Sequence, residues 1–269
     1  MAFATYDAYL DALALNNFAD FQTSAPAFGV ARFGALPIIP APATPTTSVA
    51  LDKDSTRAIN SAVPNAGAGR LSVLGARVNP SGVGGVGLML VDLLNISGGL
   101  DATVTTAQTT NLPTAALTRY TNGADVQVAL IIHAQIGTTI TTVTVSYTNQ
   151  AGTSGQTSTA VQIGGINFRE AGTLIRIPLA AGDTGVRSVE SVTLVASTAT
   201  AGNFGVVLYR PLAMFAINDT EGANVIDCVS SGRMAGQFNE VLDAACLSIF
   251  CSAAAGSQVL IGAILLAEA

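Results

Sequence analysis

His133 is the one histidine of the chain, so only this side chain could serve as the imidazole base of a Ser-His-Asp or Cys-His mechanism. It lies in an apolar run, residues 126–136, on the side that also carries Gln127 and Gln135. No GxSxG motif, the turn that exposes a nucleophilic serine, occurs in the sequence. We therefore expect His133 to lie on a polar strand face, and we expect the protein not to be an enzyme.

Three glycines, Gly82, Gly84 and Gly87, have the GxGxxG spacing with which a loop and a helix start bind a dinucleotide. That motif requires a βαβ unit and an acidic residue about 20 positions later. Asp101 has nearly this spacing, but the chain as a whole does not alternate strands with helices. We expect a glycine loop with no cofactor.

Oxygen ligands for calcium could come from Asp52 and Asp54, or from residues 218–222, which read Asn-Asp-Thr-Glu-Gly. Neither group follows the EF-hand pattern, and each fits a turn in which short polar side chains bind the local backbone. The cysteines are odd in number and lack CxxC spacing, which favours small buried hydrophobic residues over a zinc site or a disulfide. They are Cys228, Cys246 and Cys251. We expect no bound metal.

Charged residues make up 10% of the chain, whereas about 25% is usual in soluble domains. The net charge is −6 and the arginines are scattered, so the basic cluster of a nucleic-acid-binding protein is missing. Interface cores are poor in charge. The composition therefore predicts a subunit whose surface is largely covered by other subunits.

The mean hydropathy is high, +0.51, but the sequence does not predict a membrane span. Its longest apolar run, residues 259–267, is shorter than the ~20 residues that a spanning helix needs. A second apolar stretch, residues 83–100, is interrupted by Asp92 and by glycines. We expect no membrane partner.

Segment 1–24 predicts a short amphipathic helix over residues 5–17. Its apolar residues follow the i, i+3, i+4, i+7 spacing of one helix face: Tyr6, Tyr9, Leu10 and Leu13. Two aspartates occupy another face, and no basic region precedes them, unlike in a signal peptide. We expect a chain made and kept in a cytosol, with a helix too short to be stable alone.

Segment 25–69 is rich in Pro, Ala and Thr, and proline favours extended backbone at itself and its predecessor. This composition predicts an extended arm between the helix and the body. Docking within the same chain is one interpretation of the helix and arm, and docking on a neighbouring subunit is the one we favour. The expected contact residues are Tyr6, Tyr9, Leu10 and Leu13 of the helix and Pro37, Ile38 and Ile39 of the arm.

Segment 70–269 predicts an all-β body, a β-sandwich or jelly roll, because short strand-like runs are separated by Gly, Asn, Asp and Pro. The clearest run is 140–147, which should form a hairpin with 156–163. We expect residues 197–203 to join two strands in another hairpin, and short helices to be inserted near 86–94 and 237–244. Further strands are expected at 71–78, 126–136, 174–179, 189–196, 204–209, 245–251 and 259–266.

The layout of helix, arm and Ala/Gly/Thr-rich β-body, with the hairpin region VTVSYTNQAGTSGQTS (143–158), resembles virion structural proteins of tailed bacteriophages. Capsid decoration, or cement, proteins are the most similar group. The resemblance implies a β-sandwich or jelly-roll body, homotrimers and attachment to a shell of major capsid protein in the virion. It implies no catalytic residues and no cofactor.

Other functions remain open. A jelly-roll major capsid protein or a tail or neck component would suit the same pattern. From a different class, a receptor- or carbohydrate-binding β-sandwich would also fit. Such a module is expected to expose aromatic side chains in its loops, whereas this chain has no tryptophan and 6% aromatic residues. An enzyme is the least favoured, because of the single histidine.

Overall fold

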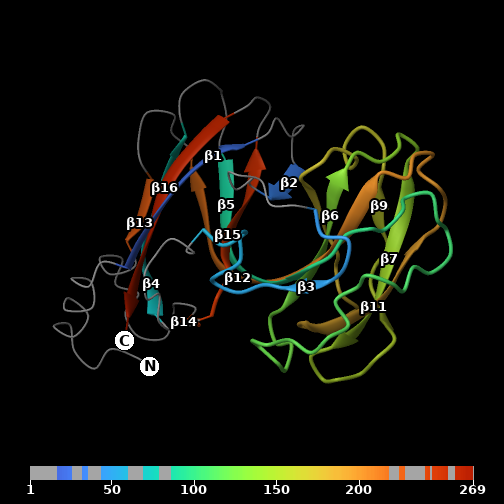
Figure 1. Cartoon of the computed structure of the whole chain (residues 1–269), viewed down its shortest axis with the longest axis horizontal. Helices are drawn as coiled ribbons and strands as arrows, with labels where there is room; N and C mark the ends of the chain where they lie inside the picture. The colour runs from blue at the N-terminus through green and yellow to red at the C-terminus, as the bar shows by residue number, and fades with distance from the viewer. Residues whose placement is uncertain are drawn as a thin grey trace.

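The computed structural model describes residues 17–25, 32–35, 44–59, 69–78, 86–217, 224–227, 240–242, 244–253 and 258–268. Every regular element within these ranges is a β-strand, and the strands pair antiparallel in three sheets (Figure 1). No helix in this part of the chain has the length and hydropathy of a membrane span. The expected all-β class and β-sandwich body are confirmed.

The four-stranded sheet lies at one end of the molecule, on the right in Figure 1. β7 (Thr141–Asn149) is central and pairs with β11 (Val186–Leu194) along one edge. Along its other edge it pairs with β8 (Gln156–Thr157) and β9 (Val161–Ile163). The hairpin expected from 140–163 is therefore present, with two short strands returning beside β7.

The seven-stranded sheet of the described residues forms the middle of the molecule. Its order is β12 (Asn203–Ile217), β6 (Gln127–Ala134), β10 (Thr173–Arg176), β2 (Arg32–Ala35), β15 (Leu247–Ala253), β5 (Val86–Ile96) and β3 (Val49–Ala50). Because β12 also pairs with β5, the hydrogen-bonded path returns to its start and only β3 lies outside the ring. Closure of this kind leaves fewer strand edges exposed.

The third sheet lies at the opposite end, on the left in Figure 1. It places β1 (Asn17–Ala25), β16 (Gln258–Glu268), β4 (Gly69–Val78) and β13 (Asn224–Asp227) in that order, and β14 (Glu240–Val241) also pairs with β4. The first and last described strands are thus neighbours, in register from Asn17 opposite Leu266 to Ala25 opposite Gln258.

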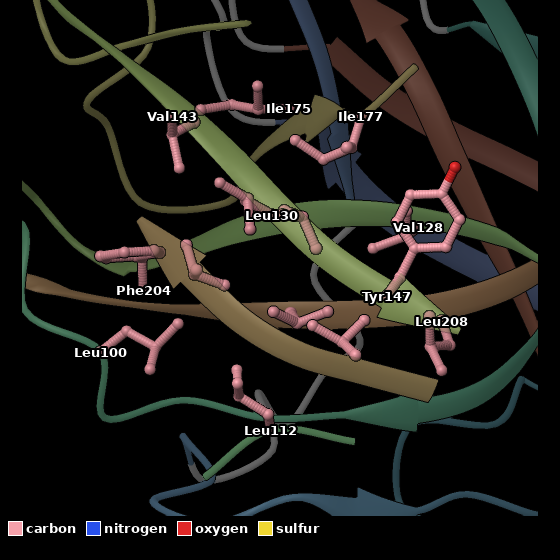
Figure 2. Close-up of a cluster of buried hydrophobic side chains, with 14 of the residues drawn as sticks. Leu100, Leu112, Val128, Leu130, Val143, Tyr147, Ile175, Ile177, Phe204 and Leu208 are labelled. Carbon is pink, nitrogen blue, oxygen red and sulfur yellow. The ribbon is translucent and has the colours of Figure 1, made fainter. Parts of the chain in front are cut away.

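Two hydrophobic cores share the strands of the middle sheet. Between this sheet and the four-stranded sheet, Leu130 of β6 and Phe204 of β12 pack with Val143 and Tyr147 of β7 (Figure 2). On the other face of the same strands, Ile131 and Tyr209 belong to a second core with Phe250 of β15. Strands buried on both faces need apolar residues at every position rather than at alternate ones.

Residues 86–94 form strand β5, so the short helix expected there is wrong. Every residue from Met89 to Ile96 is buried, Asp92 and Asn95 included, because side chains of β5 enter both cores: Leu94 belongs to one, and Val91 and Leu93 belong to the other. Such a run cannot be distinguished from a buried helix by its periodicity. In the second region where a helix was expected, 237–244, Glu240–Val241 is the strand β14, and residues 237–239 and 243 lie outside the described residues.

The hairpin expected at residues 197–203 is also wrong. The two strands that this segment joins, β11 and β12, belong to different sheets: β11 pairs with β7, and β12 pairs with β5 and β6. The connection crosses from one layer of the sandwich to the other and is held by the buried Thr198. The hydroxyl of Thr198 accepts a hydrogen bond from the Gly137 amide at 3.2 Å.

Residues 5–16 of the expected N-terminal helix lie outside the described residues, and Asn17–Ala25 forms strand β1. The expected arm, 25–69, is described only in parts. Two of these parts, Arg32–Ala35 and Val49–Ala50, are strands β2 and β3 of the middle sheet. All the expected contact residues of helix and arm lie outside the described residues: Tyr6, Tyr9, Leu10, Leu13, Pro37, Ile38 and Ile39.

Candidate interaction surface

The outward side of the four-stranded sheet carries rows of hydroxyl side chains. Opposite residues of an antiparallel pair lie on the same side of the sheet. Thr144 therefore sits beside Thr193, and Ser146 beside Ser191. We call this surface the hydroxyl face; its residues are Thr142, Thr144, Ser146, Thr148, Ser188, Ser191 and Thr193.

Local sequence explains why the hydroxyl groups point outward. In β7 the buried residues Val143, Val145 and Tyr147 alternate with more exposed ones, as expected of a half-buried strand. In β11 the buried valines are three residues apart, at 186, 189 and 192, a spacing that does not suit a regular strand. Two register shifts against β7 absorb the extra residues and keep every valine on the core side.

The charged side chain in the middle of this face, Glu190, is bound by local donors. Its carboxylate accepts hydrogen bonds from the Thr148 hydroxyl at 2.6 Å and the Ser146 hydroxyl at 3.2 Å. The Gly155 amide donates a third bond, at 3.0 Å, which ties the 150–155 loop to the sheet. The Glu190 carboxylate thus holds the β7–β8 hairpin in place and already accepts three hydrogen bonds within the chain.

A second polar network anchors the same sheet from its core side. The hydroxyl of the buried Tyr147 donates to Asp183 at 2.7 Å and accepts from the Ala180 amide at 2.7 Å. Asn149 donates to the other carboxylate oxygen of Asp183, also at 2.7 Å. Burial, reinforced by Asp183, raises the pKa of Tyr147 to about 12, so the phenol stays neutral and keeps this bond.

A buried ion pair lies in the middle sheet. Asp92 of β5 receives two hydrogen bonds from the Arg119 guanidinium, at 2.7 and 3.0 Å, and a third from the Cys246 amide at 2.9 Å. Arg119 also donates to the carbonyl oxygens of Leu51 and Leu93, both at 2.9 Å. These bonds hold the segments that contain Leu51, Arg119 and Cys246 against β5, so the ion pair has a structural role.

His133 is partly buried and binds the backbone. Its Nε2 lies 2.8 Å from the carbonyl oxygen of Ser97, and because a carbonyl only accepts, Nε2 must carry a proton. Burial lowers the pKa of His133, and the positive charge of Arg57 lowers it further. The ring therefore stays neutral near pH 7 and ties the end of β5 to β6.

The other candidate residues have structural surroundings where they are described. Cys246 and Cys251 are buried free thiols, as expected, and Cys228 lies outside the described residues. Asp52 accepts hydrogen bonds from the Ser55 hydroxyl and the Asp54 amide. These bonds belong to a turn, which was the alternative to a metal site. No three His, Cys, Asp or Glu side chains of the described residues group as metal ligands. Gly87 lies in β5, whereas Gly82, Gly84 and residues 218–222 are outside the described part.

A small pocket of about 250 Å³ lies beside β3, against residues 112–118. Its lining is apolar or weakly polar, with Leu94, Leu112 and Leu117 beside Ser48 and Asn95. Ligand pockets usually hold roughly 300–1,000 Å³ and a few convergent polar groups. The pocket lacks a titratable side chain in its lining, so the hydroxyl face is the better candidate for recognition.

The chain matches no family model, and no curated protein matches it significantly. Among solved structures it aligns with the infectious bursal disease virus VP2 subviral particle, at 10% identity over 92% of this chain and 79% of that one, with a TM-score of 0.18. The structure of the Gt strain of the same virus aligns at 10% identity over 93% and 80%, also with a TM-score of 0.18. These viral structures are weak neighbours, and a TM-score this low does not establish a common fold.

Proposed function

We propose that the protein is a structural subunit of a virion, a decoration or cement protein that binds and stabilises a phage capsid shell. The observation that carries this proposal is the hydroxyl face. This face is the outer surface of the strand pair β7 and β11. The pair contains two charged residues, Arg187 and Glu190, and both form hydrogen bonds within the chain.

Such a surface suits a partner protein better than bulk solvent. The cores of protein interfaces are depleted in charge, because each buried charge must be desolvated and paired. Threonine and serine side chains lose little conformational freedom when covered, and their hydroxyl groups can donate and accept. A face of this kind can dock on a neighbour without leaving a buried charge unpaired.

The proposed mechanism is cumulative burial. Each contact of the face is weak, but copies repeated around a symmetric shell bind with avidity. The proposed partners are other copies of the chain, in a homotrimer, and a major capsid protein. The proposed location is the virion, and we propose no catalytic activity, cofactor, nucleic acid or membrane partner.

The proposal is tested by following the full chain through a density gradient of particles from its source, with immunogold labelling of the intact particles. We expect the chain to sediment with the particles and the label to decorate their outside. Mild denaturant should release the chain and leave closed shells. Shells that fall apart on release would indicate a major capsid protein, label confined to a tail would indicate a tail component, and a chain that stays at the top of the gradient would contradict a virion role.

The hydroxyl face is tested by rebinding the purified chain to stripped particles. Thr144→Lys places a charge at the centre of the face and should weaken rebinding by about tenfold or more, because the charge must be desolvated. Thr118→Lys is the matched control, an exposed threonine beside the pocket, and should rebind like the parent chain. Equal rebinding of both variants would exclude the hydroxyl face as the contact.

A further inference from the structure

The outer strand of the middle sheet, β3, has an edge that no other strand of the described residues pairs with. Its pairing with β5 is on the opposite edge. The Leu51 amide donates to the Leu94 carbonyl at 3.0 Å, so these two residues form a hydrogen-bonded pair. Such pairs alternate along an antiparallel ladder, so Ala50, opposite Asn95, turns its amide and carbonyl groups away from β5. The edge therefore presents a backbone donor and a backbone acceptor to a further strand.

The small pocket described above lies beside this edge. One of its walls is β3, with Ser48 and Ala50, and the other is the segment 114–118. The backbone of residues 115–118 makes no hydrogen bond with other described residues, so this wall is unpaired as well. The most buried apolar residues of the lining are Leu94, Leu112 and Leu117. The pocket is thus apolar at its base and has unpaired backbone along its sides.

The volume of the pocket suits one side chain. An apolar cavity of about 150 Å³ can hold a benzene molecule. The pocket measures about 250 Å³, which is enough for an aliphatic side chain but below the usual size for a whole ligand. In protein contacts, residues that fill a pocket often contribute most of the binding free energy. The pocket therefore has the dimensions of an anchoring site.

Asn95 supplies the pocket with a hydrogen-bond donor. Its side chain is 5% exposed and lies on the same side of the sheet as that of Ala50, the residue opposite. The Oδ1 atom accepts from the Ser48 hydroxyl at 2.7 Å, whereas the Nδ2 group has no acceptor among the described residues. A buried donor without an acceptor is costly, and a carbonyl oxygen from a ligand would satisfy it.

We propose that the pocket and the open edge of β3 together bind an extended peptide segment of a partner protein. The segment adds a strand beside Ala50 and places one aliphatic side chain against Leu112 and Leu117. One of its backbone carbonyl groups accepts from Nδ2 of Asn95. The strand edge selects an extended backbone, and the pocket selects a single apolar side chain. No residue of the hydroxyl face lines the pocket, so this is a second site and the inference does not rest on the virion role.

The test is a titration of the isotope-labelled full chain with the capped tripeptide acetyl-Thr-Leu-Thr-methylamide, followed by NMR. We expect saturable shifts of the backbone amides of Ala50 and residues 115–118, with a dissociation constant of about 1 mM. Acetyl-Thr-Gly-Thr-methylamide is the matched control peptide. It should bind about tenfold more weakly or worse, because it has no aliphatic side chain to bury.

Two substitutions of Ala50 separate strand pairing from filling of the pocket. Ala50→Pro removes the outward amide, and proline is tolerated at a strand edge where the N–H does not take part in the ladder. Ala50→Val is the matched control, since valine has the same number of side-chain carbons and keeps the amide. We expect Ala50→Pro to bind the leucine peptide about fivefold more weakly than Ala50→Val. Circular dichroism melting curves show whether both variants remain folded.

Three results would overturn the inference. One is the absence of saturable shifts at Ala50 and residues 115–118 with the leucine peptide. Another is equal affinity for the leucine and glycine peptides, because the pocket would then hold no side chain. The third is equal affinity of Ala50→Pro and Ala50→Val for the leucine peptide, which would indicate a pocket for small apolar groups without strand pairing.

Discussion

Replacing Arg119 by methionine should destabilise the protein by about 3–5 kcal/mol, the usual cost of removing one partner from a buried ion pair. The Arg119 side chain is 5% exposed and that of Asp92 is fully buried. The substitution leaves the Asp92 carboxylate in the core with the Cys246 amide as its one remaining donor of the three described above. The carbonyl oxygens of Leu51 and Leu93 lose a donor as well, which adds to the cost.

The free energy of unfolding is measured by urea denaturation followed by circular dichroism, in a double-mutant cycle with Asp92→Leu. Because the double variant contains no unpaired buried charge, it should be more stable than Arg119→Met alone. Lys53→Met is the control: its ion pair with Asp54 has side chains 40% and 73% exposed and should contribute about 1 kcal/mol at most. An Arg119→Met cost below about 1 kcal/mol, or simple additivity in the cycle, would refute the assigned role of the pair.

Three further predictions concern single sites. The free energy of unfolding should fall as the pH rises from about 10 toward 12, because the pKa of Tyr147 is raised to about 12 in the folded chain and the unfolded chain ionises first. Tyr147→Phe should make the free energy of unfolding less dependent on pH in this range. Cys246 and Cys251 should react with a thiol reagent far more slowly in native protein than in urea, since burial raises the pKa of each to about 12, and peptide mass mapping would expose a fast native reaction at either one. Gly137→Ala should cost about 1–3 kcal/mol, because its Cβ would lie 1.6 Å from the Thr198 carbonyl oxygen, and an unchanged melting curve would contradict that close approach.

The strands that the sequence predicts best are those with one buried and one exposed face. In β7 the alternation of Val143, Val145 and Tyr147 with hydroxyl residues specifies both the strand and the direction of its side chains. Ile140 departs from this alternation, since it is apolar and exposed at a position where the pattern calls for a polar residue. A single exposed isoleucine is common on protein surfaces.

The features that the sequence does not predict depend on how the strands pack and pair. Met89–Ile96 of β5 is buried on both faces and is apolar except for Asp92 and Asn95, so its periodicity does not distinguish it from a buried helix. β11 places valines three residues apart, and only its pairing with β7 shows that register shifts accommodate them. Residues 197–203 look like a hairpin turn because the strands on each side are close in sequence, but they pair in different sheets.

The sequence by itself determined the all-β class, the hairpin of β7 and the low charge of the surface, because these depend on residue type and on spacings within a few residues. Tertiary structure alone decided which strands are neighbours, and so which side chains meet. The ion pair joins Asp92 to Arg119 across 27 positions, and Tyr147 meets Asp183 across 36. Contacts of this kind arise from the packing of sheets, for which the local pattern of apolar residues holds no information.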